Sequence, residues 1–227
     1  MPPNTVNVPE SFEALFNDAE NYVKNYFNSF AQAPDKGSIT IGGERYILVR
    51  AASMSVHFLE HIKNMYPAMG ERESIDASSR VLFDIAHTIG KNDAVAFHKA
   101  TNVTDPLAKL STGPVHFAYT GWAFVDILPD SKPSPDESYY LIYDHPHSFE
   151  ADAWIAQDTK TDFCTCFMNS GYSTGWCEES FGLKLHTREI LCRAKGDDYC
   201  RFIMAPSDKL DAYIEAYKEE HPDLFNH

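Results

Sequence analysis

Apolar residues at helical spacing predict four amphipathic helices in the chain. Within residues 11–30, Phe, Leu, Ala and Val side chains recur every three or four positions. Similar stripes run through residues 52–66, 75–100 and 207–220, and the longest is 75–100. The first and last of these helices are each expected to begin at a serine, a residue type that caps helix N-termini.

Other stretches show strand patterns. Residues 38–41 and 44–49 flank a Gly-Gly pair, which is typical of a β-hairpin with a two-residue turn. The aromatic run 115–128 follows a short helical piece that Gly-Pro is expected to end. This run alternates on two partly apolar faces, which predicts a central strand paired with residues 138–143 across a Pro-rich loop.

The remaining elements are shorter. Ser148 is expected to cap a helix over residues 149–157, because two acidic residues follow in its first turn. Residues 164–168 resemble a strand, and residues 169–181 a glycine-containing helix. Residues 184–193 and 199–204 predict a second hairpin around Gly196.

Composition narrows the classes of function. At 227 residues and 44% apolar content, the chain can bury the core of one domain. The formal net charge of −14 argues against nucleic acid or an anionic membrane surface as a direct partner. Without a signal-like start or an apolar run of about 20 residues, we expect a cytoplasmic, reducing environment.

All five cysteines lie between Cys164 and Cys200, which points to a shared chemical role. If Gly196 centres the second hairpin, Cys192 and Cys200 face each other at roughly 5 Å. That spacing suits a metal site, but a disulfide or two inert buried thiols would fit it as well.

A metal site would need further ligands. Glu189 precedes Cys192 by three residues, and Cys164, Cys166 or Cys177 could complete a tetrahedral set. In a regular strand Glu189 and Cys192 point to opposite faces. Both can bind one ion only if the strand bulges or ends between them.

Five motifs occur in order and carry a resemblance to a known family: ASSRVLFDIAHTIGKNDAVAFH, GPVHFAYTGWAFVDI, DHPHSFEADAW, GYSTGWCEESFG and REILCRAKGDDYCRF. Together they resemble the XylR N-terminal region joined to a 4-vinyl reductase domain, over roughly residues 75–204. The resemblance implies an α/β (α+β) fold, with an antiparallel sheet flanked by helices. It also implies a dimeric sensor of aromatic effectors such as phenols.

The same resemblance implies a structural zinc ion and a division of the chain. The family's three cysteine ligands and one glutamate fall on Cys166, Glu189, Cys192 and Cys200, so the zinc would pin the C-terminal hairpin. Residues 1–74 are expected to form a dimerisation segment and residues 75–206 the ligand-binding domain. Residues 207–227 are expected to form a last helix and a tail.

Aromatic residues and histidines are the expected wall of the ligand pocket. They are His116, Phe117, Tyr119, Trp122, Phe124, Tyr143, His145, Trp154, Tyr172 and Trp176. In phenol-sensing relatives a histidine and a tryptophan hold the phenolic hydroxyl, and here those positions are Phe117 and His145. The resemblance therefore does not identify phenol as the ligand of this chain.

The favoured interpretation is a zinc-containing binding module that acts as a stand-alone homodimer and senses an aromatic or apolar small molecule. One alternative is an enzyme acting on a hydrophobic molecule. Its acid–base groups or second metal ligands would come from Asp144, His145, His147, Glu178 and Glu179. Another alternative is a scaffold that uses the fold only to dimerise.

Overall fold

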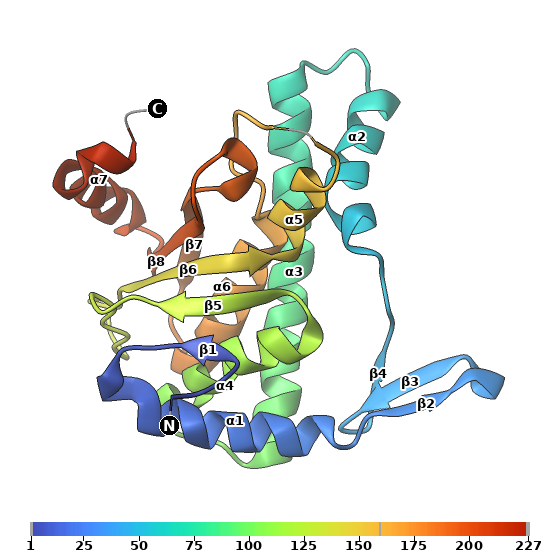
Figure 1. The fold of residues 1–227 in the computed structure, drawn as a ribbon, viewed down its shortest axis with the longest axis vertical. Coiled ribbons are helices and arrows are strands. Elements are labelled where there is room, and N and C mark those ends of the chain that lie inside the picture. Colours follow the sequence, from blue (N-terminus) through green and yellow to red (C-terminus); the bar gives the residue numbers. More distant parts are fainter. Residues whose placement is uncertain (1, 159, 226–227) are drawn as a thin grey trace.

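Five strands form one twisted sheet in the computed structural model, which describes residues 2–158 and 160–225 (Figure 1). The strands are β1 (Val6–Asn7), β5 (Ala123–Ile127), β6 (Leu141–Ser148), β7 (Leu185–Leu191) and β8 (Cys200–Pro206). Their order is β1-β5-β6-β8-β7, and all neighbours are antiparallel except β1 and β5. The expected α/β fold with a largely antiparallel sheet is confirmed.

Side-chain alternation gives the sheet two different faces. Ile142 and Ile203 point to the outer face and pack against Leu210 and Ile214 of α7 (Leu210–Glu220). The inner face, which includes Tyr143, belongs to the main core beneath five further helices. These are α1 (Glu13–Phe27), α3 (Glu71–Thr101), α4 (Pro106–Thr120), α5 (Phe149–Ile155) and α6 (Phe167–Phe181).

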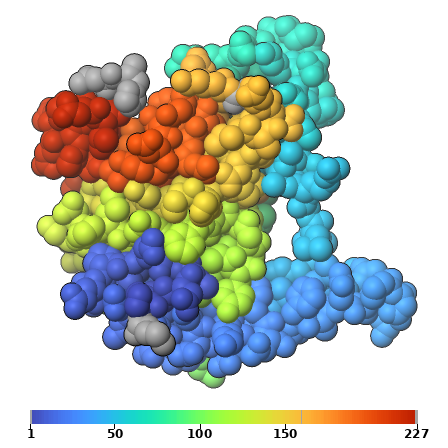
Figure 2. All heavy atoms as spheres, viewed as in Figure 1, coloured from blue at the N-terminus to red at the C-terminus, as the bar shows by residue number. Residues whose placement is uncertain are grey.

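The N-terminal part includes a separate small sheet. It consists of β2 (Ala31–Ala33), β3 (Ser38–Ile41) and β4 (Glu44–Tyr46), and the predicted Gly-Gly turn joins β3 to β4. The small sheet projects from the body, and an extended link leads from it to α2 (Val56–Met65) (Figures 1 and 2). Short 3-10 turns occupy Glu10–Phe12, Pro34–Lys36, Ala51–Met54, Arg193–Lys195 and Pro222–Leu224.

The predicted long strand 115–128 is wrong. Its first half belongs to α4, which runs through Pro114 to Thr120, and only Ala123–Ile127 is strand. Asp105 caps α4 by accepting from the Ala108 amide at 2.9 Å. A Cβ at Gly113 would lie 2.8 Å from the Trp176 ring, so this glycine serves helix packing and does not end the helix.

Several predicted boundaries also change. Residues 164–168 form no strand, because α6 already begins at Phe167. Strand β6 continues past residue 143 to Ser148, where the predicted cap of α5 is confirmed by the bond from the Ala151 amide. The expected serine caps of the first and last helices are wrong, since α1 begins at Glu13 and α7 at Leu210. Among the described residues, no helix is long and apolar enough to cross a membrane.

Glycines allow α6 to lie directly against α3. A Cβ added to Gly171 would be 2.2 Å from the Phe83 carbonyl oxygen, and one added to Gly175 would be 2.2 Å from that of His87. Across the interface, a Cβ at Gly90 would be 2.3 Å from the Tyr172 carbonyl oxygen. No side chain fits at these three positions unless the two helices separate.

We predict that Gly171→Ala lowers the melting temperature, although alanine normally favours a helix interior over glycine. The clash with the Phe83 carbonyl should cost about 1–3 kcal/mol or more, because both backbones would have to move. Gly70→Ala is the matched control, since no atom lies within 4 Å of its new Cβ. Thermal unfolding of both variants measures the difference. Equal melting temperatures would contradict the packing argument.

Candidate functional site

A bulge at the end of the β7–β8 hairpin brings the predicted metal ligands together. Glu189 pairs with Phe202 and Leu191 with Arg201, so β7 carries one extra residue between these pairs. This confirms the irregularity that the opposite strand parity of Glu189 and Cys192 required.

Four potential ligand atoms then meet in a buried cluster made of Cys166, Glu189, Cys192 and Cys200. One atom from each residue lies within 4.8 Å of the other three. The Sγ atoms of Cys166 and Cys200 are 3.7 Å apart, and Glu189 Oε2 accepts from the Cys166 amide at 2.8 Å. Cys166 directly precedes α6, so the cluster joins the start of that helix to the hairpin.

The chemistry of this cluster favours a cation. Burial raises the pKa of the Cys166 thiol and of the Glu189 carboxyl, because a charged form loses its hydration there. Glu189 Oε1 is buried without a hydrogen-bond partner. A divalent metal ion would satisfy that oxygen and compensate the charge of several thiolates, so the residues present fit a metal site.

Neighbouring groups are placed to support thiolates. The Arg193 amide donates to Cys200 Sγ at 3.4 Å, and the hydroxyls of Thr165 and Ser148 lie 3.4 and 3.2 Å from the Sγ atoms of Cys192 and Cys166. All five cysteines are free thiols. Cys164 is half-buried outside the cluster, and Cys177 lies elsewhere, on α6.

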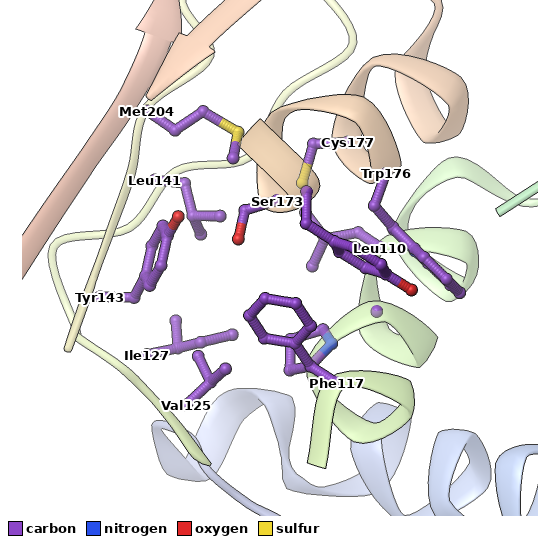
Figure 3. Close-up of a pocket in the computed structure, with 13 residues that line it drawn as sticks. Leu110, Phe117, Val125, Ile127, Leu141, Tyr143, Ser173, Trp176, Cys177 and Met204 are labelled. Atoms are coloured by element: carbon purple, nitrogen blue, oxygen red, sulfur yellow. The ribbon is translucent and has the colours of Figure 1, made fainter. Parts of the chain in front are cut away.

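An apolar cavity lies between the inner face of the sheet and helices α4 and α6 (Figure 3). Its volume is about 40 Å³, several times the ~10–15 Å³ that one water molecule needs. The cavity is lined by Leu110, Gly113, Pro114, Phe117, Val125, Ile127, Leu141, Tyr143, Tyr172, Ser173, Trp176, Cys177 and Met204. None of these residues carries a formal charge at neutral pH.

Four of the residues expected in the pocket wall line this cavity: Phe117, Tyr143, Tyr172 and Trp176. Trp122 lies behind the wall, with its ring centroid 4.7 Å from that of Tyr172. Three others lie away from the cavity. Tyr119 is 40% exposed beside Phe27, Phe124 lies on the opposite face of β5 from the lining residue Val125, and Trp154 packs on Phe163.

Both expected polar residues of the pocket are buried next to it rather than in its wall. His116 Nδ1 lies 3.1 Å from the Tyr172 hydroxyl, which also donates to Asp93 at 2.9 Å. His145 contacts the rings of Phe117 and Tyr143, and neither of its ring nitrogens has a hydrogen-bond partner. Burial lowers the pKa of both imidazoles to about 3, so both are neutral near pH 7.

The aliphatic half of the cavity was missed by the sequence-based selection of aromatic residues. Val125 and Ile127 share one face of β5, and Leu141 lies on the same face as Tyr143 in β6. The alternation of side chains along these two strands predicts that the three aliphatic residues face the cavity. On α6, Ser173 and Cys177 are four residues apart and flank Trp176, so helical spacing would have indicated them too.

The residues considered for an enzyme do not converge. Asp144 is bound by Arg201 through two 2.7 Å bonds, and Glu178 pairs with His87 at 2.9 Å. His147 is exposed whereas His145 is buried, because a bulge in β6 opposite residues 124–126 changes the strand's alternation.

Comparison with known proteins finds a remote relative in sequence and a solved structure with a similar fold. The phenol regulator MopR of Acinetobacter guillouiae is 22% identical over 187 residues, which are 82% of this chain and 32% of that regulator. The chain thus spans about a third of the length of that relative. No family model matches the chain.

The crystal structure of the phenol-responsive sensory domain of the transcription activator PoxR with phenol has the same fold. The TM-score is 0.70, with 20% identity, over 87% of this chain and 96% of that domain. The motif-based resemblance to XylR-type N-terminal aromatic-effector sensor domains is therefore confirmed. In sequence this chain is similar to a phenol regulator, and in fold it is similar to a phenol-responsive sensory domain.

Proposed function

We propose that this chain is a sensor domain that binds a small aromatic or apolar molecule in the cavity between the sheet and helices α4 and α6. The observation that carries this proposal is the cavity lined almost entirely by apolar side chains. Two relatives support it, since one is named a phenol regulator and the other a phenol-responsive sensory domain. Of the groups considered for an enzyme, Asp144 and Glu178 are paired with Arg201 and His87, and His147 is exposed.

The proposal includes a structural zinc ion held by Cys166, Glu189, Cys192 and Cys200. Three soft thiolates and a carboxylate suit tetrahedral zinc better than the hard cations calcium or magnesium. Four protein ligands leave no position for a substrate, so such an ion would supply folding energy rather than catalysis. It would tie the β7–β8 hairpin to the start of α6.

A dimer through the N-terminal part completes the proposal. Ile47 and Leu48 of the extended link are 76% and 80% exposed, and Val49 is also exposed. Apolar side chains gathered in this way often mark a contact surface, and a second copy of the chain is the partner that the resemblance implies.

We expect about one zinc ion per purified chain. Cys192→Ser should lose the ion and unfold or aggregate, because the remaining buried acidic groups would be left uncompensated. Cys164→Ser is the matched control, since this nearby thiol is outside the cluster and should keep both metal and stability. Elemental analysis and thermal unfolding test this. A metal-free wild-type protein would contradict the ligand assignment.

Filling the cavity should weaken ligand binding. Val125→Phe places a larger side chain in the cavity wall and is expected to weaken binding of phenol and toluene by about tenfold or more. Phe124→Tyr, on the other face of the same strand, should leave binding unchanged. Isothermal titration calorimetry measures both. A wild-type protein that binds neither compound would count against an aromatic-ligand sensor.

Native mass spectrometry should detect a dimer at micromolar concentration. Leu48→Asp should shift the equilibrium towards monomer, because an exposed apolar side chain becomes a charge that the interface would have to bury. Its fold should remain intact, since Leu48 is exposed within the chain, and circular dichroism checks this. A monomeric wild-type protein would exclude the dimer.

A further inference from the structure

The cavity has one buried polar atom that the protein itself leaves unused. Tyr143 is 2% exposed, and its hydroxyl oxygen has no hydrogen-bond partner. A buried hydroxyl in this state loses its bond to water and gains nothing in return. The Ser173 and Thr187 hydroxyls lie near it but do not form a bond of normal geometry with it.

The other polar groups of the wall are already engaged. The Tyr172 hydroxyl donates to Asp93 and also contacts His116. The Cys177 thiol interacts with the hydroxyl of Tyr139, which in turn donates to the Met204 sulfur at 3.6 Å. Figure 3 shows the Tyr143 and Ser173 hydroxyls on facing sides of the cavity, one from β6 and one from α6.

The two positions where the family resemblance implies a polar anchor, Phe117 and His145, do not offer one in this wall. Phe117 has no polar atom, and His145 is not among the lining residues. The His145 ring lies beyond Tyr143 and Phe117, at centroid distances of 5.3 and 5.8 Å.

We propose that the Tyr143 hydroxyl, assisted by that of Ser173, is the polar anchor of the ligand. This inference rests on the proposed function and names the ligand's chemistry. Tyr143 donates, so the ligand carries a hydrogen-bond acceptor, such as a hydroxyl or carbonyl oxygen, at one end of a small apolar body. Because no charged side chain lines the cavity, the bound molecule is neutral, and carboxylates are excluded.

The chemistry of Tyr143 agrees with a donor role. Burial raises the pKa of its hydroxyl well above the ordinary value, so the proton stays on the oxygen throughout the physiological range. A ligand oxygen placed between β6 and α6 would satisfy this donor and could itself donate to Ser173. One bound group would thus connect the central strand to the helix.

The test compares phenol with toluene, which has the same ring and a methyl group in place of the hydroxyl. Titration calorimetry gives the ratio of the two dissociation constants for each variant. Tyr143→Phe should change this ratio by about tenfold in favour of toluene, because only phenol loses a partner. Ser173→Ala should change it in the same direction by about threefold.

Tyr139→Phe is the matched control. It removes an equally buried hydroxyl that is outside the cavity wall and leaves only the weak sulfur acceptors of Cys177 and Met204 without their partner, so the ratio should stay close to that of the wild type. An unchanged ratio in both Tyr143→Phe and Ser173→Ala would overturn the anchor and leave the sensor function intact. Wild-type protein that binds neither phenol nor toluene would overturn the sensor function together with the anchor.

Discussion

The close approach of α6 to α3 is the constraint on which the rest of the inner layer depends. Glycines at positions 90, 171 and 175 leave no side chain between the two backbones, so α6 lies directly against α3. Its N-terminus is also fixed, because the buried Glu150 carboxylate accepts from the Met168 and Asn169 amides. With α6 held in this way, the space left beneath β5 and β6 becomes the cavity.

Local signals predicted the elements whose residues decide their own conformation. The Gly-Gly hairpin, the Ser148 cap and the long stripe of α3 follow from turn chemistry, capping and periodicity. Helix α4 could not be predicted in this way, because Gly113-Pro114 and alternating aromatic residues favour a break and a strand. Gly113 packs against Trp176 inside this helix, and that tertiary contact joins residues 63 positions apart, which local patterns do not reveal.

Bulges occur in the strands beside both candidate sites, and a sequence reveals a bulge only when regular alternation conflicts with chemistry. The conflict between Glu189 and Cys192 required a bulge, and it is present. No such conflict marked the bulge in β6 that separates buried His145 from exposed His147. Spacing also could not select Cys166, since it reaches the hairpin from the start of α6. The family resemblance selected it, and it lies in the cluster with the other three residues.

One residue connects the cavity wall with the N-terminal part. The Tyr172 ring lines the cavity, and its hydroxyl binds Asp93, whose pKa burial raises to about 6. The hydroxyls of Tyr26 in α1 and Tyr46 in β4 interact with each other within the electrostatic reach of Asp93. A molecule that moves Tyr172 therefore alters a buried polar network shared with the small sheet.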